Sequence, residues 1–103
     1  MHHDRKASAQ ALTLLRALSE QPRTWRHGYD LSRDTRLRSG TLYPILMRFT
    51  DRRLLDSKWQ PAEAAGRPPR HLYRLTAQGI AYAQQQLDAA SAVRFAAPLR
   101  GRA

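Results

Sequence analysis

The chain has 103 residues, 42% of them hydrophobic, a formal net charge of +10 and no cysteine. This length suits one domain with a modest core, and the apolar fraction excludes wholesale disorder. The absence of cysteine excludes disulfides, thiolate catalysis and cysteine-based zinc sites. The charge favours a polyanionic partner, and without an apolar signal core or a run near the ~20 apolar residues of a membrane span we expect a soluble, cytoplasmic protein.

Two helices are predicted in the first third of the chain. After a flexible N-terminus over residues 1–7, a first helix continues until Pro22 closes it. A basic connection over residues 23–27 leads to a second, shorter helix, Gly28–Arg36, with Tyr29, Leu31 and Thr35 expected to be buried. The first helix shows the i, i+3, i+4, i+7 spacing of a buried face at Ala11, Leu14, Leu15 and Leu18, with Leu12 alongside.

A third helix is predicted after the short break Leu37–Ser39, and Ser39 is suited to be its N-cap. Two helices joined by a turn of about three residues are typical of a helix-turn-helix. The apolar stripe of the third helix is Leu42, Ile45, Leu46 and Phe49, so its outer face presents Tyr43, Pro44, Met47, Arg48 and Asp51.

The periodicity then changes to that of a β-hairpin. The segments Leu54–Gln60 and His71–Thr76 read as strands, and the Pro-, Ala- and Gly-rich segment Pro61–Pro69 forms a long basic loop between them. A hairpin directly after a helix-turn-helix is a wing. We expect Trp59 to pack this wing against the domain.

A fourth helix is predicted over Ala77–Phe95, capped by Thr76, and Pro98 is expected to end any helix before a flexible tail over residues 96–103. This helix could simply cover its own core, but its seam of small and apolar residues, with almost no charge, favours a partner helix instead. The predicted fold class is mainly α with a small β-hairpin: a winged helix-turn-helix over residues 8–76 and a C-terminal dimerisation helix over residues 77–95. The dimerisation residues are Leu12, Ile80, Ala83, Leu87 and Ala90.

The positive charge is concentrated in the predicted helix-turn-helix and wing. Twelve arginines and lysines stand against five acids between Arg23 and Arg74, whereas residues 75–95 are neutral overall. All cations except Lys6 and Lys58 are arginine, whose forked guanidinium fits phosphates and guanine edges. Such a charge suits nucleic acid or a membrane surface, and the arginine preference favours nucleic acid. Codon bias would also explain the preference for arginine, but it would not explain the segregation.

The candidate DNA contacts follow from this arrangement. A helix reads base edges in the major groove with its exposed face, and free N–H groups at its start attract phosphate. In the wing, Gly66 permits a turn and two prolines stiffen the tip that carries the arginines. The recognition helix and turn supply Arg36, Arg38, Ser39, Thr41, Tyr43, Met47 and Arg48, and the wing supplies Lys58, Arg67 and Arg70.

Two strings resemble the PadR family of winged-helix transcriptional regulators: GTLYPIL at residues 40–46 and GRPPRHLYRLT at residues 66–76, with a Trp59-bearing strand between them. The resemblance covers roughly residues 9–90 and is closest to the compact branch of the family. It implies a DNA-binding homodimer that commonly represses nearby genes. In such proteins the third helix enters the major groove, the wing touches the backbone or minor groove, and the last helix forms the dimer with help from the first.

The chain departs from the family pattern at the end of the third helix. Thr50 stands where the family usually has an acidic residue, and Arg53 stands where it usually has glycine. Glycine there would serve a left-handed helix end, a conformation that costs arginine roughly 1 kcal/mol. We therefore expect the helix to end differently, with Arg53 adding charge beside the DNA.

Other functions are less well matched. A winged helix used as a protein–protein adaptor is the main alternative, although it needs no cationic face. RNA binding would require exposed aromatic rings, for which only Tyr43 and the two tryptophans could serve. The sequence holds no catalytic set, no cofactor motif and no metal-ligand spacing around its four histidines. A small-molecule effector of unknown identity could bind between subunits, near Tyr82 and Phe95.

Overall fold

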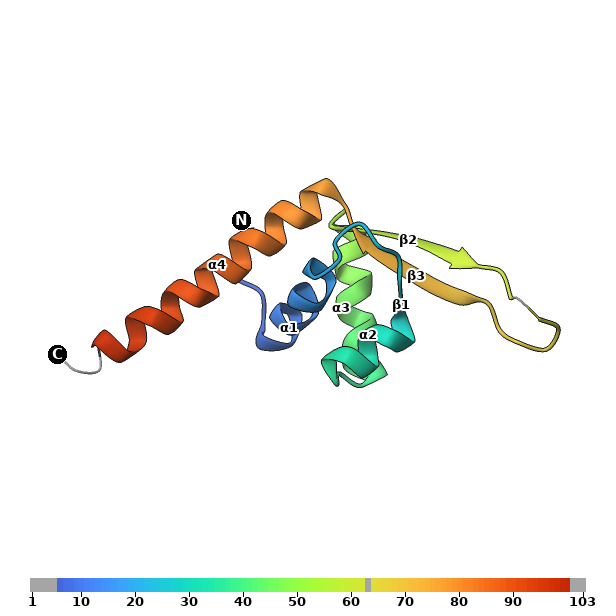
Figure 1. The fold of residues 1–103 in the computed structure, drawn as a ribbon, viewed down its shortest axis with the longest axis horizontal. Coiled ribbons are helices and arrows are strands. Elements are labelled where there is room, and N and C mark those ends of the chain that lie inside the picture. The colour runs from blue at the N-terminus through green and yellow to red at the C-terminus, as the bar shows by residue number, and fades with distance from the viewer. Residues whose placement is uncertain (1–5, 63, 101–103) are drawn as a thin grey trace.

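The computed structural model describes residues 6–62 and 64–100, with side chains up to residue 92. The molecule measures 63 × 27 × 23 Å, and the hairpin and the last helix leave the central helices in opposite directions (Figure 1). The mainly α fold with a small β-hairpin is therefore confirmed. Along the chain the elements are α1 (Ala9–Ser19), β1 (Arg26–His27), α2 (Gly28–Thr35), α3 (Ser39–Asp51), β2 (Leu55–Gln60), β3 (Arg70–Leu75) and α4 (Ala77–Arg100).

One hydrophobic core joins all four helices to the root of the hairpin. The predicted apolar faces of α1 and α3 are confirmed, because every residue of both stripes is buried. From α2 only Leu31 contributes a large buried side chain, whereas Tyr29 is 73% exposed, so its predicted burial is wrong. An eight-residue helix turns too few residues inward to bury both. The other buried core residues are Leu54, Leu55, Tyr73, Leu75 and Ala83.

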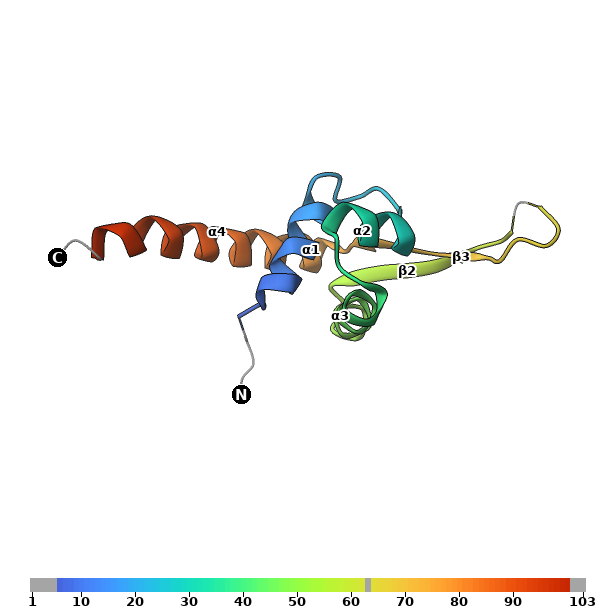
Figure 2. The same cartoon turned by 90° about the horizontal axis from the view of Figure 1, so that it is seen from below.

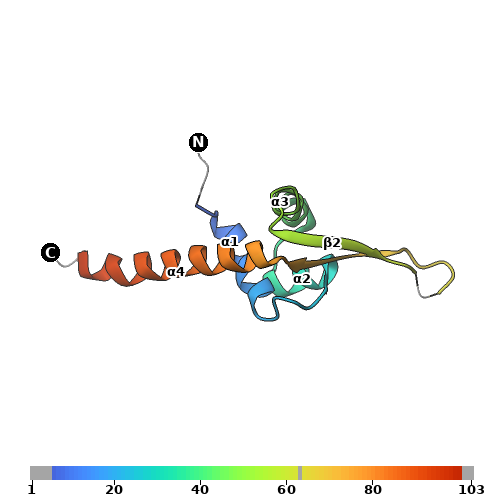
Figure 3. The ribbon, with the colours of Figure 1, turned by 90° about the horizontal axis from the view of Figure 1, so that it is seen from above.

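The sheet has three antiparallel strands in the order β1-β3-β2, rather than the two expected. The additional strand is Arg26–His27, whose residues pair with Tyr73 and Leu72 of β3. Two charged or polar residues show no alternation, so this strand had no signal in the sequence. Seen from below and from above, α3 is viewed nearly end-on and the hairpin leaves the central helices beside it (Figures 2 and 3).

The end of α3 shows the left-handed geometry that the arginine was expected to avoid. Arg53 has φ 63°, its N–H donates to the carbonyl of Thr50, and the N–H of Leu54 donates to the carbonyl of Phe49. This pair of hydrogen bonds is the Schellman motif, which usually places glycine at the left-handed position. The expectation of a different helix end is wrong, because core residue Leu54 and these two hydrogen bonds hold Arg53 in a strained conformation.

Helix α4 is capped as predicted and packs tightly on the end of α3. Thr76 Oγ1 accepts a hydrogen bond from the Gly79 N–H at 2.9 Å and donates to the Arg53 carbonyl at 2.8 Å. A Cβ on Gly79 would overlap the backbone carbonyl of Leu54. Gly79 therefore allows the first turn of α4 to touch the main chain after α3.

Both ends of the chain differ from expectation where they are described. Helix α4 continues to Arg100, past the expected end at Phe95 and past Pro98. A proline so near the end of a helix removes one hydrogen bond and does not stop the last turn. Ala7, expected in a flexible segment, packs against the core and donates its N–H to Gln86 Oε1 at 2.9 Å. Residues 1–5 and 101–103 lie outside the described residues.

Across the part of the chain that the structure describes, no helix combines the length and the apolar character needed to cross a membrane.

Candidate nucleic-acid interface

The turn between α2 and α3 is held by side chains of α2. Thr35 Oγ1 donates to the Leu31 carbonyl at 2.6 Å and accepts from the Leu37 N–H at 3.2 Å, while Ser32 Oγ donates to the Leu37 carbonyl at 2.6 Å. Arg36 ends α2 in the left-handed conformation, with φ 63°. These contacts fix the angle at which α3 leaves α2, and they leave the side chain of Arg36 exposed.

The start of α3 differs from its predicted form. The N-cap is Arg38, without a side-chain cap bond, and Ser39 is the first helical residue. The Thr41 N–H already donates to the Arg38 carbonyl at 2.9 Å, so the backbone N–H groups without such a bond belong to Ser39 and Gly40. The side chain of a serine at the first helical position points outward from the helix, so it does not cap the free N–H groups of the first turn. Ser39 thus offers an exposed hydroxyl and not a cap.

The outer face of α3 is exposed as predicted, and Tyr43 has an additional contact. Thr41, Met47 and Arg48 are exposed, Met47 to 64%. Tyr43 is 36% exposed, and a Cβ on Gly28 would overlap its hydroxyl. Tyr43 therefore braces α3 against the start of α2, and glycine at position 28 leaves room for this ring.

The charged residues of α2 are paired with one another or with their neighbours, unlike the arginines on the rest of this face. Asp34 pairs with Arg26 at 2.7 Å, and Asp30 lies 3.3 Å from both His27 and Arg33. The acids of α2 are thus engaged by neighbouring cations. Among the described residues, by contrast, no ion pair or side-chain hydrogen bond engages the three exposed arginines of the turn and α3: Arg36, Arg38 and Arg48.

The wing presents its predicted cations in different directions. Arg67 lies in the loop at the tip, where Gly66 has φ 85°, and Arg70 lies at the start of β3 with its Nη1 3.5 Å from His27 Nδ1. Lys58 stacks on the ring of Trp25, with its Nζ 4.4 Å from the ring centroid. Because side chains alternate along a strand, Lys58 lies on the opposite face of β2 from Trp59.

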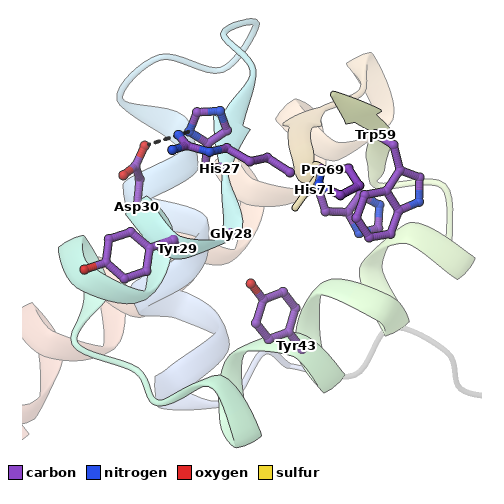
Figure 4. Close-up of a pocket in the computed structure, with 9 residues that line it drawn as sticks. His27, Gly28, Tyr29, Asp30, Tyr43, Trp59, Pro69 and His71 are labelled. Carbon is purple, nitrogen blue, oxygen red and sulfur yellow. Dashed lines mark hydrogen bonds and ion pairs between the residues drawn. The ribbon is translucent and has the colours of Figure 1, made fainter. Parts of the chain in front are cut away.

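A hollow of about 790 Å³ lies between the start of α2, α3 and the wing. Figure 4 shows Tyr43 on α3 and Trp59 with His71 on the wing, and His27 and Tyr29 line the hollow at the start of α2. Arg70 and Tyr43 are the predicted contact residues that line this hollow. Sequence reasoning missed Trp59, His27, Tyr29 and His71 as lining residues.

Three rings follow one another along the hollow side of the wing. The Trp59 and His71 rings stack with centroids 4.3 Å apart and planes at 12°, and His71 Nδ1 lies 2.9 Å from the buried Tyr73 hydroxyl. Burial lowers the pKa of His71 and raises the pKa of Tyr73, which Tyr43 raises further. Both shifts favour the neutral forms of the two side chains, which share the hydrogen bond between the Tyr73 hydroxyl and His71 Nδ1.

Trp59 does not pack the wing against the domain, since it is 64% exposed. That prediction is wrong because Trp59 lies beyond the last buried residue of β2, where a hollow separates it from α3. The ring that joins the wing to the domain is Trp25, on which Lys58 and Arg74 both stack. The sequence held a signal for this exposure. Leu55, Ser57 and Trp59 share one face of β2, and that face is buried only at Leu55, before it runs towards the hairpin tip.

The residues predicted for dimerisation divide into two groups. Leu12, Ile80, Leu87 and Ala90 are half-buried on α1 and α4. Ala83 is only 1% exposed inside the protein's own core, so its assignment to a dimer surface is wrong: its small side chain lets α4 approach α1. Tyr82 packs edge-on to Phe49 under the guanidinium of Arg52, and the side chain of Phe95 lies outside the described residues.

The described residues hold no group of three or more His, Asp or Glu side chains placed to bind one metal ion. The chemistry available at this face is therefore hydrogen bonding, cation–anion pairing and ring packing.

Comparison with known proteins gives one family and several solved structures. The family described as "Transcriptional regulator PadR-like family" matches residues 14–85. A PadR-like transcription factor from Bacteroides fragilis is 26% identical, with a TM-score of 0.65 over 90% of this chain and 88% of that one. A PadR-like transcriptional regulator from Bacillus cereus is 19% identical, with a TM-score of 0.69 over 90% and 91% of the two chains.

A third similar structure is BpsR of Bordetella bronchiseptica, whose DNA binding is regulated by 6-hydroxynicotinic acid. It is 23% identical, with a TM-score of 0.72, and the alignment covers 92% of this chain and 67% of BpsR. No protein of curated function matches the chain.

Proposed function

Because the chain belongs to the PadR-like family of transcriptional regulators, we propose that it binds double-stranded DNA sequence-specifically as a homodimer and represses transcription. The chain is a regulator and not an enzyme. The observation that carries the proposal is the set of exposed arginines on the turn and on α3 that have no partner among the described residues. Unpaired guanidinium groups beside a protruding helix suit the phosphates that flank a DNA groove.

In this proposal α3 lies in the major groove with Thr41, Met47 and Arg48 towards the base edges. Arg48 can fork onto guanine, and Met47 offers an apolar contact to a thymine methyl group. Arg36, Arg38 and the hydroxyl of Ser39 hold phosphates at the groove edge. Arg67 and Arg70 hold the backbone from the wing, whereas Lys58 contributes least because its ammonium group already stacks on Trp25.

The dimer is proposed to form along α4. The C-terminal half of α4 extends away from the other helices, so it offers a long face to a second copy (Figure 1). Leu12 and Ala90 line one shallow hollow beside α4, and Ile80 and Leu87 line another. A twofold dimer places two α3 helices about 34–36 Å apart, and it would read a pseudo-palindromic operator with half-sites at that spacing.

The proposal places the protein in the cytoplasm of a bacterium, where a regulator meets the chromosome, and the compared regulators come from bacteria. A small-molecule effector of unassigned identity is part of the proposal. It is supported by BpsR, which shares this fold and has a DNA-binding activity regulated by a small aromatic acid.

The decisive experiment selects duplexes from a random pool and measures their binding at several salt concentrations. We expect a symmetric consensus, with log K falling by about 0.9 per phosphate contact for each log unit of salt. Arg48→Ala should weaken binding and relax sequence preference, and Arg36→Ala should weaken all sequences alike. Arg16→Ala, which removes an exposed arginine from α1, is the matched control and should change neither.

An adaptor that binds proteins through its winged helix would select no duplex, and this outcome would refute the proposal. The dimer is tested separately by sedimentation. Leu87→Glu should shift the protein towards monomer, whereas Gln85→Glu places the same charge on an exposed position of α4 and should not. Equal sedimentation of both variants with the parent would refute the proposed dimer surface.

A further inference from the structure

Trp59 is a large apolar side chain that the fold leaves in solvent. It is 64% exposed, although burial of so large an apolar ring is favourable. Trp59, Tyr43 and Tyr29 are all exposed and line the same hollow, and contiguous exposed apolar surface of this kind marks a binding site. The ring lies near the outer end of β2, where it stacks on His71.

The ring is also held in place. Trp59 and His71 are direct cross-strand partners, and their rings are stacked nearly parallel at 4.3 Å. His71 is fixed in turn by the hydroxyl of Tyr73, which is 3% exposed. One face of the Trp59 ring is thus covered by a support that reaches back to the core. A ring that is already ordered loses little entropy when a partner covers its other face.

The position of Trp59 relates it to the recognition helix. It lines the same hollow as Tyr43 of α3 and Arg70 of the wing. Figure 4 shows the Tyr43 and Trp59 rings on two sides of this hollow. By strand alternation Arg70 and Lys58 both stand on the hairpin face opposite Trp59, but Arg70 still lines the hollow, whereas Lys58 stacks on Trp25. A strand of DNA that follows the wing beside α3 would therefore pass over Trp59.

Resting on the proposed function, we propose that Trp59 is a DNA-contacting residue, whose free ring face packs on a deoxyribose of the strand that runs between α3 and the wing. Arg70, on the same rim, suits a phosphate of that strand. The group between successive phosphates is the sugar, whose C–H surface is apolar and matches a ring. This contact is uncharged, and it therefore adds affinity without releasing counterions.

Salt dependence separates this contact from the arginine contacts. We expect Trp59→Ala to weaken binding of the selected duplex about five- to twentyfold at every salt concentration, as expected for loss of a buried ring face. The slope of log K against log salt should stay at the parent value. Arg70→Ala should lower that slope by about one contact. Trp59→Phe keeps a ring and should retain most of the affinity, and circular dichroism checks that each variant is folded.

Fluorescence gives an independent readout, because the protein has two tryptophans. In a Trp25→Phe variant that still binds the duplex, Trp59 is the remaining tryptophan, and DNA should protect it from iodide quenching. In Trp59→Phe, the same DNA should leave quenching of Trp25 unchanged. Parent-like affinity of Trp59→Ala, or iodide access to Trp59 that DNA does not alter, would overturn the inference while leaving the proposed function standing. Failure of the parent to bind any duplex would overturn both.

Discussion

Gly79→Ala is the substitution whose effect the structure defines most sharply. The new Cβ would overlap the carbonyl oxygen of Leu54 and would lie 2.8 Å from its carbon and 3.2 Å from its Cα. Those atoms belong to the main chain after α3, which is fixed by the Schellman hydrogen bonds and cannot rotate away. The first turn of α4 must therefore move off the end of α3.

The cost follows from the contacts that this movement breaks. The Thr76 N–H donates to the Leu54 carbonyl at 3.0 Å, and Thr76 Oγ1 donates to the Arg53 carbonyl at 2.8 Å. Two such hydrogen bonds contribute about 1–3 kcal/mol together, and overpacking adds about 1–3 kcal/mol. Alanine returns about 1 kcal/mol through its higher helix propensity. The net loss in the free energy of unfolding should be about 1–5 kcal/mol.

The assay is urea unfolding followed by circular dichroism, at equal protein concentration because dimerisation would shift the midpoint. Gly40→Ala is the matched control, since it makes the same change inside α3 and its Cβ would meet nothing within 4 Å. It should gain up to about 1 kcal/mol. If Gly79→Ala were as stable as Gly40→Ala, the close approach of α4 to Leu54 would be refuted.

Three further predictions concern strain, the ion pair between Arg26 and Asp34, and pH. Arg53→Gly should raise the free energy of unfolding by about 1 kcal/mol in the same assay, because glycine adopts φ 63° without strain; a loss would refute the strain. Arg26→Met should lower it by about 1–2 kcal/mol, since the guanidinium binds Asp34 and the Ala17 carbonyl, and a parent-like midpoint would contradict this. Burial lowers the pKa of His71 in the folded protein, so the contribution of neutral His71 to stability is complete above the unfolded pKa of 6.5 and is lost as pH falls through the folded pKa. His71→Gln should therefore reduce the loss of stability at acid pH. An unchanged loss would show that other groups cause it.

Much of the candidate interface could be predicted from local patterns. The stripe of α3 has one buried face, so the residues opposite it had to be exposed, and Thr41, Met47 and Arg48 are. The arginines of the turn were recognisable because a short break between two helices lies at the surface. These inferences need only the period of a helix and the position of a break.

Other features depended on neighbours distant in the sequence. Trp59 was assigned to packing from its residue type, whereas its exposure follows from the hollow that separates the outer half of β2 from α3. Ala83 belongs to a small-residue seam that suits either a partner helix or α1 of the same chain, and the packing of α4 on α1 decided for the latter. The pairing of Arg26 and His27 with β3 also lies outside any local pattern.

The sequence by itself determined the order of the helices and the hairpin, the apolar face of each helix and the segregation of charge, because these follow from periodicity and composition along the chain. Only the tertiary structure decided which charged side chains are paired and which stay exposed without an ion-pair partner among the described residues. Pairing on α2 neutralised its acids and left the arginines of the turn and α3 exposed, while the Schellman contacts held Arg53 in a conformation that its side chain disfavours. Contacts between distant segments outweigh local preferences of about 1 kcal/mol when the core fixes both partners.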